Sequence, residues 1–199
     1  MLLKLGEILF KLRDYSPIPF VIIMFIYGNP VLESIIAGLI MVVIGESTRI
    51  RGVSHIGGVS RTRSFSTGQK LIMSGPFAHV RNPLYIGNFF LSTGFVVLSN
   101  VSHYFTAIFI LAFFVQYIPI VLWEEENLKK VFPKEYKEFF DNVPRWIPSF
   151  KKYDSGSEKI KGDLLAAIKS EKQTFTAAII VFSVLMFREE IAQFFSQYF

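Results

Sequence analysis

A chain of 199 residues that is 51% hydrophobic, with 22 phenylalanines and a mean hydropathy of +0.41, is too apolar for an ordinary soluble domain. Its net charge of +5 does not indicate nucleic-acid binding, because the basic residues are spread along the chain rather than gathered in one groove. The sequence has no cysteine and its three histidines form no HxxxH pair, which argues against a disulfide framework and a structural metal. We therefore expect an all-α integral membrane protein with one domain.

The first third of the chain predicts an interfacial helix and a hairpin. Residues 1–16 place leucines on one helical face and basic residues elsewhere, which is typical of an amphipathic helix at a membrane surface. Residues 17–45 hold two apolar segments divided by Asn29-Pro30, and both are short against the roughly 20 residues that span a bilayer. A signal peptide over residues 1–28 is the rival interpretation, but no small-residue cleavage site follows the apolar core.

A polar stretch and a second hairpin follow. Residues 46–83 contain one acid, Glu46, against six basic residues, and should form a cytoplasmic loop. Residues 84–123 predict a hairpin with a short turn at 100–103. Asn82 and Pro83 predict where its first helix begins, because asparagine is a good N-cap and proline fits the first helical position.

The last part of the chain predicts surface helices and one segment that either spans the membrane or lies on its surface. Residues 124–150 repeat apolar side chains at helical spacing, so an amphipathic helix should lie on the cytoplasmic surface. Residues 151–199 predict a linker and then a C-terminal helix that begins near Asp163. Its apolar part, residues 174–187, is either a fifth span or an interfacial helix. The predicted fold is a helical bundle of about five transmembrane helices.

The distribution of lysine and arginine predicts the orientation. The segments before residue 17, from 46 to 83 and from 123 to 173 carry 3, 6 and 11 of the 21 basic residues, which leaves Arg188 alone on the other side. Cytoplasmic segments are enriched in Lys and Arg. We therefore expect the N-terminus and the active site to lie on the cytoplasmic side. The membrane that we expect for this protein is the cytoplasmic membrane of a prokaryote.

Two charged groups at the cytoplasmic ends of the second hairpin suggest a binding site. The free N–H groups of the helix that begins at Pro83, with Arg81 beside them, could bind a carboxylate or phosphate. Three adjacent glutamates, Glu124 to Glu126, repel one another at the membrane edge and call for a cationic partner, for which Arg145 or a positively charged ligand is a candidate. The alternative is that Arg81 is only one more positive charge on the cytoplasmic side and that the three glutamates are a solvated acidic run at the membrane edge.

S-adenosylmethionine carries the carboxylate, the ammonium and the second positive centre that would suit both groups. Its adenine and ribose would need an aromatic or apolar slot and hydrogen-bond acceptors. Phe77, His79, Tyr85 and a glutamate could supply them.

Two motifs carry a family resemblance over residues 69–148. The segment GPFAHVRNPLYIG resembles the G-x-Y-x-x-x-R-H-P-x-Y-x-G signature of the isoprenylcysteine carboxyl methyltransferase and phospholipid methyltransferase-like membrane enzymes. The segment that begins at Glu124 and continues into VPRWIP resembles their second signature, E-E-x-x-L-x-x-x-F-G-x-x-Y-x-x-Y followed by V-x-x-x-x-P. The resemblance implies a bundle of about five spans that binds S-adenosylmethionine near the cytoplasmic face and takes a lipophilic substrate from the bilayer.

Matching positions imply a set of cofactor-binding residues. These are Gln69, Lys70, Leu71, Ile72, Phe77, Asn82, Pro83, Leu84, Tyr85 and Glu124, to which our interpretation of the charges adds His79 and Arg81. The sequence departs from the signatures where Asn82 replaces the histidine, Phe77 and Phe139 replace tyrosines and Pro133 replaces the glycine. Ile120 stands where the eukaryotic isoprenylcysteine enzymes have a basic residue.

The function expected from these features is S-adenosylmethionine-dependent methyl transfer to a lipophilic acceptor. A carboxylate acceptor needs no base, whereas a phospholipid amine must lose a proton, for which Glu125 or His79 is the candidate. Arg145 or Arg49 could bind an acceptor carboxylate. One alternative is a non-catalytic membrane scaffold or subunit that retains the fold, as the departures at Asn82 and Pro133 would suggest. Another is a transporter or channel component, which should bury ionisable residues deep in its spans, and only Glu33 comes near such a position. The expected partners are membrane lipids and the substrate; the sequence does not indicate the oligomeric state.

Overall fold

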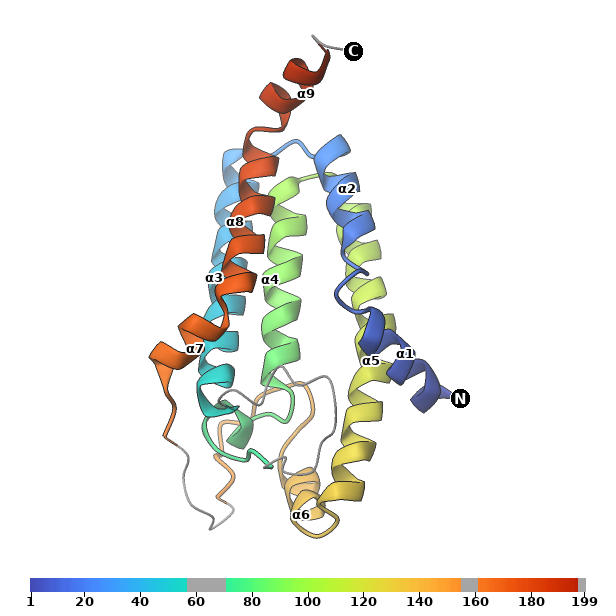
Figure 1. Cartoon of the computed structure of the whole chain (residues 1–199), viewed down its shortest axis with the longest axis vertical. Helices are drawn as coiled ribbons and strands as arrows, with labels where there is room; N and C mark the ends of the chain where they lie inside the picture. The colour runs from blue at the N-terminus through green and yellow to red at the C-terminus, as the bar shows by residue number, and fades with distance from the viewer. Residues whose placement is uncertain (57–70, 155–160, 197–199) are drawn as a thin grey trace.

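The computed structural model describes residues 1–56, 71–154 and 161–196, and all regular structure in them is helical (Figure 1). This confirms the all-α prediction. The elements are α1 (Leu2–Leu12), α2 (Ile18–Tyr27), α3 (Leu32–Ile56), the 3₁₀ helix η2 (Gly75–Ala78), α4 (Pro83–Ser99), α5 (His103–Val131), α6 (Glu135–Asn142), α7 (Leu164–Ser170), α8 (Lys172–Met186) and α9 (Arg188–Ser196).

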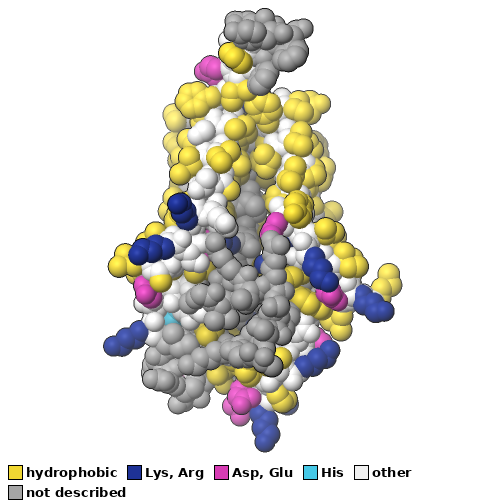
Figure 2. All heavy atoms as spheres, in the orientation of Figure 1, with side chains coloured by type: hydrophobic (Ala, Val, Ile, Leu, Met, Phe, Trp, Pro, Cys, Tyr) yellow, Lys and Arg dark blue, Asp and Glu magenta, His cyan; other side chains and the backbone are white. Residues whose placement is uncertain are grey.

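The helices α2, α3, α4, α5 and α8 run roughly along the longest axis (Figure 1). Hydrophobic side chains cover the upper half of the face in Figure 2, while most Lys and Arg side chains lie around the lower half. The segments around η2 and α6 lie together at the lower end, and α9 lies at the opposite end (Figure 1). The two polar stretches that were expected to share one side are thus at the same end of the bundle.

Among the described helices, α5 is the one that is both long and apolar enough to cross a membrane. The helices α2, α4 and α8 are apolar but shorter. Large apolar side chains on α5 point outward, with Leu111 at 66% and Val115 at 62% relative exposure. An outward apolar surface of this kind is typical of a helix that contacts lipid.

Glycines at seven-residue spacing bring α3 and α4 into backbone contact. Gly38, Gly45 and Gly52 on α3 are buried, and Gly87 and Gly94 of α4 lie against them. A Cβ atom at Gly45 would lie 2.4 Å from the backbone N of Leu91, so no larger residue fits without moving a helix. Small residues permit such close approach between membrane helices, where dispersion contacts replace the hydrophobic effect as the main attraction.

Replacing Gly94 with valine should separate α3 from α4. A Cβ at this position would lie 2.8 Å from the carbonyl oxygen of Gly38, and overpacking of this kind costs about 1–3 kcal/mol. Thermal unfolding of the purified protein in detergent measures the loss. The matched control is Ala37→Val on the exposed face of α3, which should change stability by no more than about 0.5 kcal/mol. Equal unfolding temperatures for both variants would contradict this packing.

The predicted interfacial helix packs on α5. Gly6 is buried, and a Cβ there would lie 2.1 Å from the carbonyl oxygen of Pro119. The rings of Phe10 and Trp123 are 5.0 Å apart. The leucines predicted to lie on one face of this helix do not all have the same surroundings. Leu9 packs against buried core residues, while Leu2, Leu5 and Leu12 are exposed.

Three predicted boundaries were wrong. Residues 46–56 were assigned to a loop, but α3 continues to Ile56, because a stretch containing Glu46 and Arg49 can stay helical when its polar side chains find partners inside the protein. Helix α5 continues through Glu124 to Val131, so the amphipathic helix expected from residue 124 is the end of α5 followed by α6. The C-terminal helix is divided into α7, α8 and α9.

Candidate active site

The loop before α4 and the end of α5 meet at the lower end of the bundle. Helix α4 begins at Pro83 with Asn82 at the N-cap position, as predicted. The side chain of Asn82, however, makes no capping bond. Its Nδ2 donates instead to Glu125 Oε1 at 3.5 Å and to the carbonyl of Arg145 at 3.3 Å. Asn82 therefore joins the start of α4 to α5 and to the segment after α6.

Tyr85 and Glu124 connect the two motifs directly. The Tyr85 hydroxyl donates to Glu124 Oε2 at 2.7 Å, and the buried Tyr85 ring packs with Tyr117 at a centroid distance of 5.1 Å. In the described part of the chain, no other hydrogen-bond donor reaches Glu124, so Oε1 is free to accept. The glutamate is thus positioned with one oxygen available to a ligand.

Glu125 lies one residue further on α5 and is only 3% exposed. Arg81 Nε donates to its Oε1 at 3.1 Å, and Arg145 Nη2 donates to its Oε2 at 2.7 Å. Arg145 Nε also donates to both oxygens, at 3.0 and 3.2 Å. These bonds to the carboxylate raise the pKa of Arg145 above its ordinary value. The predicted cationic partner of the glutamate cluster is therefore confirmed as Arg145, and Arg81 is a second one.

Arg81 also fastens the loop to the segment after α6. Its Nη1 donates to the carbonyls of Phe140 and Val143 at 2.6 and 2.9 Å, and its backbone N–H donates to Pro144 at 2.9 Å. The guanidinium stacks over the Phe140 ring at 4.1 Å. An arginine used in this way has few donors left for a ligand, so the geometry favours a structural role over the anion site expected from sequence.

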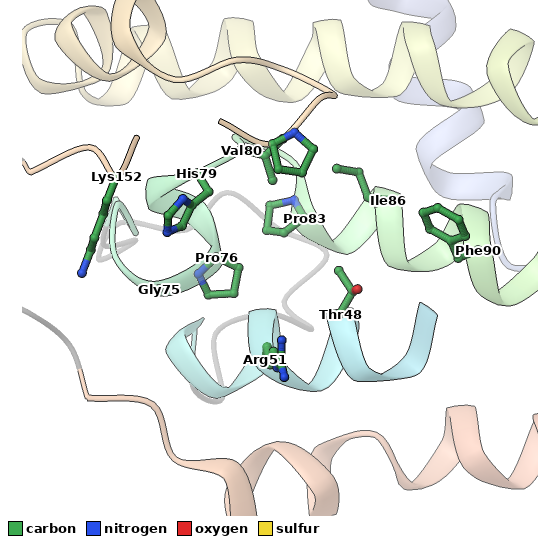
Figure 3. Close-up of a pocket in the computed structure, with 11 residues that line it drawn as sticks. Thr48, Arg51, Gly75, Pro76, His79, Val80, Pro83, Ile86, Phe90 and Lys152 are labelled. Atoms are coloured by element: carbon green, nitrogen blue, oxygen red, sulfur yellow. The ribbon is translucent and has the colours of Figure 1, made fainter. Parts of the chain in front are cut away.

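The other predicted cofactor residues divide into three groups. Gln69 and Lys70 lie outside the described residues. Leu71, Ile72 and Phe77 are half-buried, and Leu71 packs against the core residues of α6. The remaining three face away from the contact between Tyr85 and Glu124: the side chain of Leu84 lies near Gly52, while His79 and Pro83 line a cavity beside α3 (Figure 3).

A second buried polar cluster was missed by sequence reasoning. Arg49 of α3 donates to Asn88 of α4 and, beyond it, to Glu171 and Thr174 at the start of α8. Glu46 Oε2 lies 3.7 Å from Arg49 Nε. The cluster thereby ties the start of α8 to α3 and α4. Its one sequence signal was a basic residue, Arg49, close to an apolar segment.

Comparison with known proteins shows the family of this chain. The family model described as phospholipid methyltransferase matches residues 34–135, which include the start of α4 and the glutamates of α5. Protein-S-isoprenylcysteine O-methyltransferase B of Arabidopsis thaliana is 31% identical over 121 residues. That alignment covers 56% of this chain and 57% of the plant protein, so the chain spans little more than half of that relative's length. No solved structure is significantly similar. With more than half of its residues matched, the chain belongs to the phospholipid methyltransferase family of membrane methyltransferases.

Proposed function

We propose that this protein is an integral-membrane methyltransferase that uses S-adenosylmethionine and acts on a lipophilic acceptor. The observation that carries the proposal is the hydrogen bond of 2.7 Å between Tyr85 and Glu124, which joins the two family motifs at one place. Two motifs 39 residues apart in sequence serve one site only if the fold brings them together. This bundle does so.

The residues at this contact fit the methyl donor. Glu124 offers a carboxylate oxygen with no donor of its own, which suits the hydroxyl groups of a ribose. Tyr85, Tyr117 and Trp146 supply aromatic surface beside it. The sulfonium of S-adenosylmethionine supplies an activated methyl group, so the protein's share is to align the acceptor and exclude water. We assign Tyr85 and Glu124 to donor binding on this geometry, whereas Asn82, Phe77, Leu71 and Ile72 are proposed for it on the family resemblance alone.

Glu125 and Arg145 take different parts in this proposal. Both oxygens of Glu125 already accept from guanidinium groups, so Glu125 is poorly suited to remove a proton. Its ion pairs instead hold the loop before α4, through Arg81, and the segment after α6, through Arg145, against α5. Arg145 is 32% exposed and uses only Nε and Nη2 on Glu125. Its remaining Nη1 can bind a negatively charged group on the acceptor. The ion pair of Glu125 and Arg145 thus holds the segments around the site together, and Nη1 of Arg145 remains available at the edge of the site.

The membrane arrangement belongs to the same proposal. We propose that α5 spans the membrane and that α2, α3, α4 and α8, which lie alongside one another in Figure 1, complete the membrane-embedded bundle. Most of the basic side chains on the visible face lie toward the lower end in Figure 2, the end at which α5 leads into α6 (Figure 1), so we assign that end to the cytoplasm. The acceptor then enters from the inner leaflet.

Incubation of membranes with isotopically methyl-labelled S-adenosylmethionine tests the function. We expect mass spectrometry of lipid extracts to reveal a labelled lipophilic product in membranes that contain the protein and none in membranes without it. The mass and headgroup of the product identify the acceptor class. If the purified protein neither binds S-adenosylhomocysteine nor labels any membrane component, the enzyme proposal fails and the non-catalytic scaffold takes its place.

A further inference from the structure

A cavity of about 510 Å³ lies beside α3, on the face of α4 that carries Pro83, Ile86 and Phe90 (Figure 3). It is bounded by α3, by η2 and the loop before α4, and by the segment that follows α6 (Figure 3). Its lining consists of Thr48, Arg51, Gly75, Pro76, His79, Val80, Pro83, Ile86, Phe90, Pro148 and Lys152. Neither Tyr85 nor Glu124 contributes to it, so this cavity is distinct from the candidate donor site.

The cavity is polar at one end and apolar at the other. Arg51 and Lys152 stand at the end near η2, while Ile86 and Phe90 extend from it along α4 toward the middle of the bundle (Figure 3). Phe90 lies two turns of helix beyond Pro83, which gives the apolar wall the direction of the helix axis. A ligand that fills the cavity must therefore have a charged head and an apolar continuation.

The charges at the polar end are unbalanced. Within the described residues, neither Arg51 nor Lys152 forms an ion pair, and no aspartate or glutamate lines the cavity. Both side chains are exposed, whereas Lys129, Lys137 and Arg145 elsewhere at this end each have an aromatic or acidic contact. Two cations that form no ion pair, in a cavity lined by no acid among the described residues, attract an anion and offer nothing to an ammonium group.

We propose that this cavity binds the headgroup of an anionic glycerophospholipid, with its phosphate on Arg51 of α3, Lys152 adding a second positive charge beyond His79, and the first carbons of an acyl chain along Ile86 and Phe90 (Figure 3). A free phosphate would leave the apolar wall uncovered, and a zwitterionic headgroup would bring an ammonium against two cations. The volume lies in the range of about 300–1,000 Å³ that small-molecule sites occupy. The bound lipid is neither donor nor acceptor in methyl transfer. It binds α3 and the loop before α4 together from the side opposite the donor site.

Native mass spectrometry of the full chain, with phosphatidylglycerol and phosphatidylethanolamine offered in turn, tests the proposal. We expect phosphatidylglycerol to be retained and phosphatidylethanolamine to be lost. Replacing both Arg51→Gln and Lys152→Gln should weaken phosphatidylglycerol retention about 10- to 30-fold, since each cation near an anionic lipid contributes on the order of 1 kcal/mol. The matched control is Lys130→Gln with Lys134→Gln, which removes the same charge from the same end and should leave retention unchanged.

Further arms separate the other occupants. A variant that fills the apolar wall, Ile86→Trp, should lower retention with both charges in place, and thermal unfolding shows whether it stays folded. Displacement of the lipid by millimolar inorganic phosphate alone would make this a free-anion site and overturn the proposal. Equal retention of the two lipids, or equal losses in the two charge variants, would also overturn it. Calorimetric titration with S-adenosylhomocysteine should give the same affinity for wild type and Arg51→Gln/Lys152→Gln; a parallel loss would assign the cavity to the methyl donor.

Discussion

Replacing Glu125 with alanine is expected to destabilise the protein by about 3–5 kcal/mol, the cost of leaving buried charge without its partner. The side chain of Arg81 is 7% exposed, and its Nε would lose the carboxylate that neutralises it. Folded proteins are stable by only about 5–15 kcal/mol, so a loss of this size removes a large share of the total. Thermal unfolding and size-exclusion chromatography in detergent measure it as a lower midpoint and a smaller folded fraction.

Two further variants show that the effect comes from the buried ion pairs. Glu126→Ala removes the next carboxylate on α5, for which no bond to another described residue is found, and should change stability by no more than about 0.5 kcal/mol. Arg145→Gln should cost less than Glu125→Ala, because Arg145 is 32% exposed and Arg81 still neutralises the glutamate. If Glu125→Ala and Glu126→Ala unfold at the same temperature, the ion-pair cluster does not hold the loop to α5.

Replacing Glu124 with glutamine should leave the protein folded but weaken its binding of S-adenosylhomocysteine by about tenfold to a hundredfold. The amide keeps the shape of the side chain and can still accept from Tyr85, whose bond to Glu124 Oε2 is 2.7 Å. It loses the negative charge, and hydrogen bonds to charged groups contribute about 1.5–3 kcal/mol. Isothermal titration calorimetry of wild type and variant measures the two dissociation constants.

Tyr85→Phe serves as the comparison for Glu124→Gln. It retains the ring that packs on Tyr117 and removes only the hydroxyl that orients the carboxylate. We expect a smaller loss of affinity, about tenfold or less, because one hydrogen bond of about 1 kcal/mol is removed and the charge stays. Unchanged binding by Glu124→Gln would place the donor elsewhere and refute the assignment of Glu124.

Much of the fold could be predicted because the signals are local. The apolar run and the Asn82-Pro83 pair predicted the start of α4 correctly, since proline fits the first helical position whatever lies elsewhere in the chain, although the Asn82 side chain makes no capping bond. The end of α3 was misplaced because Arg49 appeared to be a loop residue. Its guanidinium bonds Asn88 and Glu171, which lie 39 and 122 residues away, and no local pattern indicates such partners. The seven-residue spacing of Gly38, Gly45 and Gly52 is a local signal of the close contact with α4, but we did not predict that contact from the sequence.

The candidate site shows the same division. By themselves, the residues of this chain determined that it is helical, that it is apolar enough for a membrane, and that two charged motifs of a methyltransferase family follow one another in order. Only the tertiary structure decided that Arg81 binds Glu125 across 44 residues, that Glu124 keeps one oxygen free beside Tyr85, and that His79 faces a different cavity. The physical reason is that helix formation and capping depend on residues a few positions apart, whereas the pairing of a buried charge depends on which helices pack together.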